Sequence, residues 1–242
     1  MSLAAKPAKP YEAVDPMPEE YRELLIRLLM IQADTETRIL FDDWPRYARF
    51  PELAPTPEDR MVMISYLREE AGHGYMAFKL LADLGVHLTA KDFEGKKHFL
   101  YVFDELPESW AELALFNCLG DRAGRYQAEE WIDCSYAPLA RVAPGVVKDE
   151  AGHGNLGYNN LKRICQSSEG QAEAERLLPK WFAISLDLFG KSESKRDERY
   201  RELGLKRRSN EEARQAYIAE VTPIIEGLGF KLPDPTAGRR FL

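Results

Sequence analysis

The pentapeptide Glu-Ala-Gly-His-Gly occurs twice in this chain of 242 residues, at Glu70–Gly74 and at Glu150–Gly154. Within each copy the glutamate and the histidine stand three residues apart, so in an α-helix they project from one face. Two Glu-x-x-His motifs on facing helices of a four-helix bundle can hold two metal ions between them. The repeat therefore constrains the fold strongly, because both copies must be helical and must face each other.

The composition predicts one globular domain over residues 1–242, with flexible ends at residues 1–10 and 233–242. The net charge of −7 opposes a broad nucleic-acid-binding surface. No apolar run approaches the roughly 18 residues that span a bilayer, and residues 1–10 lack an apolar signal segment, so we expect neither a membrane span nor export. The three cysteines form no Cys-x-x-Cys pair, which favours a reducing cytoplasm.

The periodicity predicts an all-α fold, a four-helix bundle with additional C-terminal helices, because apolar residues recur at spacings of three and four and strand signals are nearly absent. The four bundle helices are expected over residues 16–43, 57–85, 109–135 and 138–168, with a kink or a later start of the fourth near Pro144. Two further helices are expected over residues 172–188 and 211–228, after a charged connection over residues 190–208.

Start and stop signals support three of these helices. Thr56 precedes Pro57, a combination typical of a helix N-terminus, and Gly85 is a plausible stop for the same helix. Capping boxes are predicted at residues 109–112 and 209–212, each with a serine followed three residues later by a glutamate.

A dinuclear site of this kind takes one more carboxylate from each of the two helices without the motif. In the first helix, Glu36 shares a face with the apolar stripe. Asp34 shares its face with Arg27 and Arg38. This phase predicts that Glu36 is the buried carboxylate.

In the third helix, Asp121, Glu129 and Glu130 compete for the corresponding position. At 1.5 Å per residue, Glu150 lies about 18 Å along the fourth helix from the turn. Asp121 lies about 21 Å before that turn, and Glu129 only about 9 Å. Asp121 is therefore the carboxylate level with Glu150.

The predicted metal ligands are four carboxylates and two imidazoles: Glu36, Glu70, His73, Asp121, Glu150 and His153. Their charge balances two divalent cations, and oxygen-rich ligation with one nitrogen per metal suits two iron ions or manganese. One Glu-x-x-His motif alone is more often a solvated pair, but two motifs with a carboxylate on each intervening helix favour a metal site. Glu69 and Asp149 are placed to orient the histidine of the opposite motif through its second ring nitrogen.

Several nearby residues have two interpretations. Tyr66, one turn before the first motif, either packs in the core, which we favour, or acts at the metal centre as a hydrogen-bond donor or redox-active phenol. Arg125 pairs either with Asp121 or with its other neighbours. The basic run at residues 206–208 is interpreted as a solvated surface rather than a phosphate site. The glycines of both motifs indicate close helix packing.

Segments that match one known protein family run along most of the chain: residues 21–27, 69–74, 109–111, 121, 135–136, 149–150 and 232–235. In these segments the chain resembles the catalytic A subunits of bacterial phenylacetyl-CoA epoxidases, within the ferritin-like di-iron superfamily. The resemblance implies a ferritin-like bundle and places the iron ligands on the same six residues. The family often has a lysine near the irons where Tyr66 stands here.

The resemblance implies a di-iron monooxygenase that activates O2 and epoxidises or hydroxylates the aromatic ring of an aryl-acyl-CoA such as phenylacetyl-CoA. It also implies an oligomer with a structural partner subunit. Electrons are expected from a separate NADPH-dependent flavin and iron–sulfur reductase, because the chain shows no cluster motif.

Two alternatives stay open. One is a ferritin-like iron oxidase or peroxidase that uses the same ligands without an organic substrate. The other is a non-catalytic scaffold subunit, which is expected to have lost ligands. The sequence leaves the acyl-CoA, the coenzyme A-binding residues and the metal loading undetermined.

Overall fold

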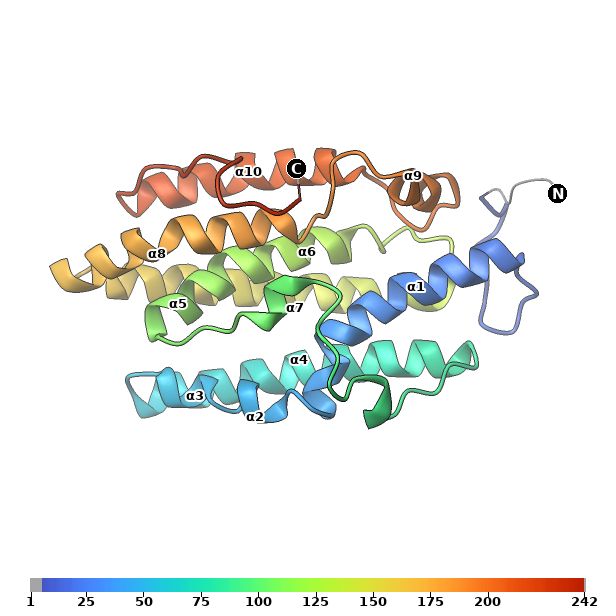
Figure 1. Cartoon of the computed structure of the whole chain (residues 1–242), viewed down its shortest axis with the longest axis horizontal. Helices are drawn as coiled ribbons and strands as arrows, with labels where there is room; N and C mark the ends of the chain where they lie inside the picture. The colour runs from blue at the N-terminus through green and yellow to red at the C-terminus, as the bar shows by residue number, and fades with distance from the viewer. Residues whose placement is uncertain (1–5, 242) are drawn as a thin grey trace. The chain divides into compact units, whose positions relative to one another are not determined.

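The predicted all-α class is confirmed in the computed structural model, which describes residues 6–241 (Figure 1). Within this part of the chain all regular structure is helical, apart from one isolated β-bridge between Tyr11 and Tyr136. No helix in the same range is long and apolar enough to cross a membrane. The expected flexible end at residues 1–10 lies partly outside the described residues.

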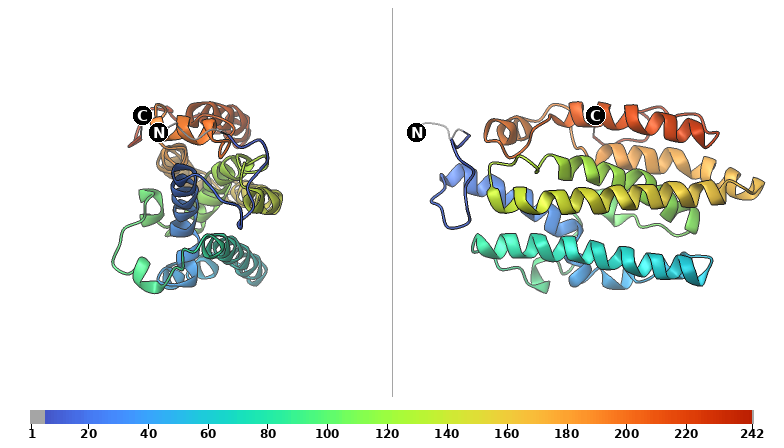
Figure 2. Two further views of the ribbon diagram at one scale, coloured as in Figure 1. Left: turned by 90° about the vertical axis from the view of Figure 1, so that its right-hand side faces the viewer. Right: turned by 180° about the vertical axis from the view of Figure 1, so that it is seen from behind.

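The helices have these bounds (Figures 1 and 2). The long helices are α1 (Glu19–Thr35), α4 (Pro57–Asp83), α7 (Ala137–Ile164), α8 (Ser168–Asp187) and α10 (Asn210–Gly227). The shorter α-helices are α2 (Trp44–Tyr47), α3 (Phe50–Leu53), α5 (Trp110–Leu115), α6 (Arg122–Glu129) and α9 (Lys195–Glu202). Three 3-10 turns are η1 (Thr37–Leu40), η2 (Ala90–Asp92) and η3 (Tyr101–Asp104), and η4 (Phe116–Asp121) is a π-helix.

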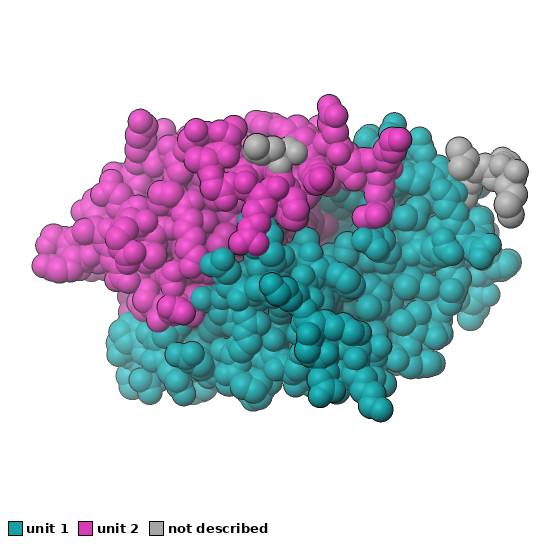
Figure 3. Space-filling view, viewed as in Figure 1, with its two compact units in different colours: residues 1–106, 130–144, 198–207 teal, residues 107–129, 145–197, 208–242 magenta. Residues whose placement is uncertain are grey.

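The chain divides into two compact units (Figure 3). Unit 1 comprises residues 1–106, 130–144 and 198–207, and unit 2 comprises residues 107–129, 145–197 and 208–242. Each unit is therefore built from segments that are far apart in the sequence. The organisation as one domain stays a prediction.

In unit 1, α1 packs against α4, and η1 and α3 also contact α4. Leu25 and Leu29 of α1 and Met63 of α4 are buried in this core. The N-terminal end of α1 is fixed by a buried hydrogen bond of 2.8 Å between the hydroxyls of Tyr21 and Ser135. The pairing of α1 with α4 buries Leu25 and Leu29 of the apolar stripe that was predicted for the first helix, whereas Leu40 of that stripe is exposed.

In unit 2, α8 packs against α5 and η4, and α10 contacts α6. Trp181 of α8 is fully buried and meets Phe116 of η4 edge-to-face, with ring centroids 5.7 Å apart. The predicted C-terminal helices, α8 and α10, are thus part of the core of unit 2.

Most predicted helix signals are confirmed. The Thr56 hydroxyl accepts a hydrogen bond of 3.1 Å from the Asp59 N–H at the start of α4, and Gly85 follows α4 with a positive φ of 78°. The capping box of Ser209 and Glu212 is complete.

The capping box at residues 109–112 is half formed. The Ser109 hydroxyl accepts from the Glu112 N–H at 3.2 Å, as predicted. The Glu112 carboxylate, however, accepts from the Glu108 N–H at 2.8 Å, one residue before the cap.

Three helix boundaries differ from the prediction. The first helix ends at Thr35 and not near residue 43, because the chain tightens into η1 after Glu36. The third is interrupted by the π-helix η4 and ends at Glu129, before the turn in which Cys134 N–H bonds to the Trp131 carbonyl. The fourth starts at residue 137 and continues through Pro144, so a later start at this proline was wrong.

The charged connection and the C-terminal segment both have defined features among the described residues. The charged connection over residues 190–208 contains α9. Near the C-terminus, the Asp187 carboxylate accepts hydrogen bonds from the backbone N–H groups of Arg240 at 2.7 Å and Phe241 at 3.1 Å. These bonds attach the end of the described chain to a fully buried carboxylate of α8.

Candidate metal centre

Unit 1 brings three of the predicted ligands together. Glu70 and His73 are buried on α4, and Glu36 lies at the junction of α1 and η1. Each of the three offers one ligand atom within 4.8 Å of the other two. The Nδ1 atom of His73 is 3.9 Å from Oε2 of Glu36. Two carboxylates and one imidazole nitrogen therefore converge at one place in unit 1.

Glu36 is held against the first motif through Gly74. A Cβ atom on residue 74 would stand 2.4 Å from the Glu36 carbonyl oxygen, a separation that real Cβ atoms do not show. The Thr37 hydroxyl donates to the Gly74 carbonyl at 2.7 Å. Only glycine lets the Glu36–Thr37 peptide lie so close to α4, which places the Glu36 carboxylate beside Glu70 and His73.

Unit 2 brings the other three predicted ligands together. Glu150 and His153 are buried on α7, with His153 Nδ1 4.0 Å from Glu150 Oε2. Asp121 is the last residue of η4, and one of its carboxylate oxygens lies within 4.8 Å of a His153 ring nitrogen. The Glu150 carboxylate also packs on Gly124 of α6, where a Cβ atom would be 3.2 Å from Oε2.

The π-helix η4 carries Asp121, and the sequence analysis did not predict it. A Cβ atom on Gly157 of α7 would stand 2.2 Å from the Cys118 N atom, so the α7 backbone lies directly against η4. π-Helical turns inside α-helices are rare and occur often at functional sites. The one sequence signal related to it is Gly157 itself, a turn after His153.

The motif glycines fall into two classes. Gly74 and Gly154 are in close contact, Gly74 with the Glu36 peptide and Gly154 with the Arg122 side chain at 3.3 Å. Among the described residues, nothing lies within 4 Å of a Cβ atom added at Gly72 or Gly152. The predicted close packing is therefore confirmed for the glycine after each histidine and wrong for the glycine before it.

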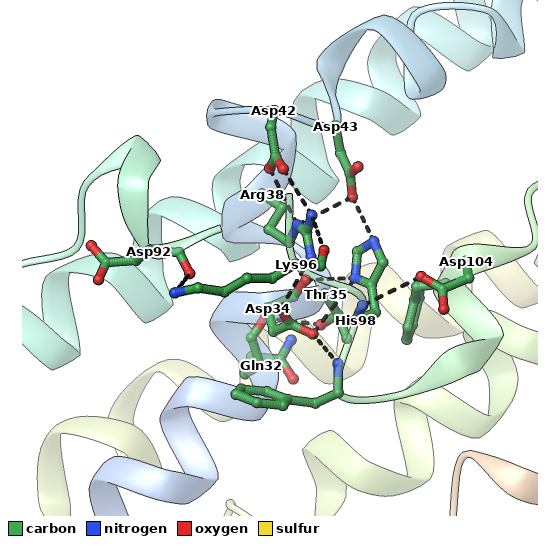
Figure 4. Close-up of polar contacts among 12 residues, drawn as sticks. Gln32, Asp34, Thr35, Arg38, Asp42, Asp43, Asp92, Lys96, His98 and Asp104 are labelled. Atoms are coloured by element: carbon green, nitrogen blue, oxygen red, sulfur yellow. Dashed lines mark hydrogen bonds and ion pairs between the residues drawn. The ribbon is translucent and has the colours of Figure 1, made fainter. Parts of the chain in front are cut away.

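Asp34 is buried and Glu36 only partly buried, which reverses the prediction from helix phase. The exposed fraction of Asp34 is 4%, and Arg38, on the same face, is also 4% exposed. Arg38 pairs with the carboxylates of Asp34 at 3.4 Å and Asp42 at 2.8 Å and donates to the Lys96 carbonyl at 3.0 Å (Figure 4). The loop around Lys96 covers this face of α1, and the sequence pattern alone does not reveal such a cover.

His98 joins the same cluster from the covering loop (Figure 4). Its Nδ1 lies 2.9 Å from the Asp34 carbonyl, and its Nε2 lies 2.8 Å from Asp43 Oδ2. Burial opposes the imidazolium charge, but the hydrogen bonds with Asp34 and Asp43 outweigh burial and raise the pKa of His98 to about 9. The cluster therefore contains a charged histidine at neutral pH.

Two tyrosines are buried close to the ligands of unit 1. Burial raises the pKa of Tyr47 well above its ordinary value, and the negative charge of Glu70 adds to this effect. The Tyr66 ring stacks on Phe50, with centroids 6.5 Å apart, and its exposed fraction is 2%. This stacking agrees with core packing, and a role of Tyr66 at a metal centre stays a prediction.

Arg125 contacts its neighbours. It pairs with Glu220 and Glu129 and lies over the Tyr126 ring, 4.8 Å from the centroid. In the basic run at residues 206–208, Arg208 pairs with Glu129 at 3.0 Å. These contacts give both arginines structural partners within unit 2.

The predicted roles of Glu69 and Asp149 in orienting the histidines stay predictions. Glu69 lies next to the first motif in unit 1 and pairs with Arg68 at 3.1 Å. Asp149 lies next to the second motif in unit 2.

The spacing of Gly152, Gly154 and Gly157 matches Gly-x-Gly-x-x-Gly, but all three lie inside α7. A dinucleotide-binding motif of this type links a strand to a helix and leaves backbone N–H groups free for a pyrophosphate. Inside α7 the spacing instead reflects close packing at Gly154 and Gly157.

The chemistry of the donors fits iron or manganese in each unit. Unit 1 offers two carboxylates and one imidazole nitrogen within 4.8 Å, and unit 2 offers two carboxylates and one imidazole. Oxygen-rich ligation with one histidine per metal is typical of iron and manganese, and no cysteine takes part. The residues can therefore bind metal.

Comparisons with known proteins identify the family of the chain. A family model described as "Phenylacetic acid catabolic protein" matches residues 1–240. The chain is 27% identical over 230 residues to the A subunit of 1,2-phenylacetyl-CoA epoxidase from Escherichia coli (strain K12), covering 93% of this chain and 73% of that protein. It is 26% identical over 161 residues to benzoyl-CoA oxygenase component B of Aromatoleum evansii, covering 62% of this chain and 33% of that protein.

Proposed function

The chain belongs to the family of phenylacetic acid catabolic proteins, and from this premise we propose that it is the catalytic subunit of a multicomponent aryl-acyl-CoA oxygenase. The reaction is epoxidation or hydroxylation of the aromatic ring, with phenylacetyl-CoA as the first substrate to test. Both curated relatives have names that describe oxygenases of coenzyme A thioesters of aromatic acids. The observation that carries the proposal is the convergence of carboxylates and one imidazole in each unit.

The proposed cofactor is a pair of iron ions, with manganese as the alternative. The proposed ligands are Glu36, Glu70 and His73 from unit 1 and Asp121, Glu150 and His153 from unit 2. Four carboxylates neutralise two divalent cations, whereas without a metal the like charges within each unit repel one another.

When bound, the iron ions supply the reduction of O2, so that one oxygen atom enters the aromatic ring and the other leaves as water at the cost of two electrons and two protons. The chain itself holds the ligands in place. Glu36 is fixed through the contact of its peptide with Gly74, and Asp121 through the contact of η4 with Gly157. Burial of the other five ligand side chains, Glu36 being only partly buried, limits the access of bulk water to them.

The proposal includes three kinds of partner. Electrons come from a separate NADPH-dependent flavin and iron–sulfur reductase. A structural partner subunit forms an oligomer with this chain. Coenzyme A carries the aromatic acid. A cytoplasmic location stays a prediction from the cysteine pattern.

The first test is metal content by mass spectrometry on protein expressed with iron. The wild type should contain close to two irons per chain, and Glu70→Ala and His153→Ala should each lose metal. Glu94→Ala changes an exposed glutamate of unit 1 and should keep the wild-type content. Folded wild-type protein without metal would contradict the proposal and would support a scaffold subunit.

The second test separates oxygenation from simple iron oxidation. The iron-loaded protein is combined with the reductase and partner subunit of the family, and O2 consumption is measured with phenylacetyl-CoA, with benzoyl-CoA and with neither. Product carrying one added oxygen atom, formed in step with NADPH oxidation, is the expected result. Equal O2 consumption without an acyl-CoA, and no oxygenated product, would indicate an iron oxidase or peroxidase.

A further inference from the structure

A carboxamide stands four residues before each ligand that lies outside the two motifs. In unit 1, the Gln32 Nε2 donates a hydrogen bond to Oε1 of Glu36. In unit 2, the Asn117 Nδ2 donates to Oδ2 of Asp121 at 2.8 Å, and this bond is buried. The same chemical pairing therefore recurs at corresponding ligands of both units, although the surrounding sequences differ.

The backbone at both ligands departs from a regular α-helix. Glu36 follows the last residue of α1 and precedes the 3-10 turn η1, and Asp121 ends the π-helix η4. Where the helical pitch changes, the neighbouring turns do not restrict a side chain as they do inside a uniform helix. A hydrogen bond to the carboxylate supplies that restriction.

The carboxamide selects one oxygen of each carboxylate. At Glu36, Oε1 accepts from Gln32, and Oε2 lies 3.9 Å from Nδ1 of His73. One oxygen is therefore turned to the carboxamide and the other toward the motif histidine. An ionised carboxylate accepts hydrogen bonds only, so the amide group must present its NH2 to it, and the orientation of the amide is fixed.

Burying the Asn117 carboxamide costs free energy, and packing alone does not explain why an asparagine stands at this position. Asn117 is fully buried, and its Oδ1 finds no hydrogen-bond donor among the described residues. A leucine has a similar size and would bury no unsatisfied acceptor. A leucine has no N–H group to donate to Asp121. The hydrogen bond to Asp121 is therefore the advantage of an asparagine over a leucine at residue 117.

We propose that Gln32 and Asn117 are positioning residues for the proposed metal ligands, each of which holds the carboxylate of one ligand, Glu36 or Asp121, so that a defined oxygen would be left for a metal. The inference rests on the proposed function for the presence of metal. Partners of ligand carboxylates typically change metal affinity by about 10- to 100-fold when they are removed. Both residues act through the carboxylate that they contact, Gln32 through Glu36 and Asn117 through Asp121.

The test is cobalt(II) binding to the metal-free full chain, with Gln32→Leu, Asn117→Leu and the wild type compared. Dissociation constants come from competition with a chelator, and the visible absorption of bound cobalt reports the ligand geometry. Each variant should bind cobalt about 10- to 100-fold more weakly than the wild type and show a shifted spectrum. Circular dichroism verifies that the helical content is retained.

The matched control is Gln127→Leu. Gln127 of α6 donates its side-chain N–H to the Leu188 carbonyl at 2.7 Å and contacts no proposed ligand in the described structure. This variant loses a carboxamide hydrogen bond of the same kind and should bind cobalt with wild-type affinity and spectrum. A loss that also occurs in Gln127→Leu would be a general effect of destabilisation and would overturn the inference.

The outcomes distinguish the positioning role from the proposed function. Wild-type affinity and spectrum in both Gln32→Leu and Asn117→Leu would overturn the positioning role and leave the proposed function intact. A folded wild type that binds no cobalt would contradict the proposed function itself. If Asn117→Leu does not fold, Gln32→Leu decides the question, because Gln32 is partly exposed and tolerates substitution more easily.

Discussion

The Gly74 Cα and the Glu36 carbonyl group lie so close that a Cβ atom on residue 74 would stand 2.4 Å from the carbonyl oxygen. The Thr37 hydroxyl completes the contact by donating to the Gly74 carbonyl at 2.7 Å. The glycine after His73 therefore fixes the separation between the first motif and the carboxylate of the neighbouring helix.

Gly74→Ala should destabilise the protein by about 1–3 kcal/mol, because the methyl group forces the Glu36 peptide away from α4. It should also weaken metal binding, since Glu36 moves with its peptide. Gly72→Ala is the control, because nothing in the described structure lies within 4 Å of the added atom. That variant should gain up to about 1 kcal/mol from helix propensity. Urea unfolding of both variants measures the difference, and equal stabilities would contradict the close contact.

Near the second motif, the tightest contact is at Gly157, one turn after His153. Gly157→Ala should destabilise unit 2, because the added methyl group would meet the Cys118 N atom at 2.2 Å and must displace η4. Since η4 carries Asp121, metal content should fall as well. Gly152→Ala on the same helix adds a methyl group where the described residues leave space. It should be at least as stable as the wild type, with a gain of up to about 1 kcal/mol from helix propensity, and should keep the wild-type metal content, as measured by thermal unfolding and by mass spectrometry.

The motif ligands could be predicted because their spacing is local. Glu70 and His73 need only one regular helix, and the start of α4 at Thr56 and its stop at Gly85 are encoded within a few residues. In each unit three of the proposed ligands lie near one another, and these three include one complete motif.

The features that were missed depend on residues distant in sequence. Asp34 was expected on an exposed face, but it bonds to His98, which lies 64 residues away in a loop without helical periodicity. The end of α1 at Thr35 and the π-turn before Asp121 depend on glycine contacts from other helices. Helix phase cannot report such contacts, because it describes one helix at a time.

His98 makes the stability of unit 1 depend on pH. Its pKa is about 9 in the folded protein and 6.5 in its ordinary environment, so folding stabilises the protonated form. The stabilisation is complete below pH 6.5 and is lost as the pH rises toward 9, and it amounts to on the order of 3 kcal/mol.

The free energy of unfolding of metal-free wild type should therefore fall between pH 6.5 and pH 9, and this fall should be smaller in His98→Gln. His87→Gln replaces an exposed histidine of the same unit and should follow the wild type. Urea titrations across this pH range measure how the free energy of unfolding of each protein changes with pH. Parallel slopes for the wild type and His98→Gln would show that the buried cluster does not hold a charged imidazole.

The carboxylates of unit 1 should oppose folding when no metal is bound. Glu36 and Glu70 bring carboxylate oxygens within 4.8 Å of each other, with Glu70 buried and Glu36 partly buried. At an effective dielectric constant of about 20, two such charges repel by on the order of 3 kcal/mol, which sets an upper limit on the gain from removing one of them. A bound cation reverses the sign of this contribution.

Glu36→Gln should therefore make the metal-free protein more stable than the wild type, by about 1–3 kcal/mol, and the new amide oxygen can still accept the hydrogen bond from Gln32. In the wild type, metal at about 100 times its dissociation constant should add about 2.7 kcal/mol to the free energy of unfolding, and this gain should shrink in the variant. Glu12→Gln, at an exposed ion pair with Arg141, is the control of equal charge change and should show neither effect. Urea unfolding of the three proteins, each with a chelator and with cobalt, measures these free energies. A metal-free Glu36→Gln less stable than the wild type would mean that Glu36 serves the fold rather than a cation, because a carboxylate kept for a metal costs stability when the metal is removed.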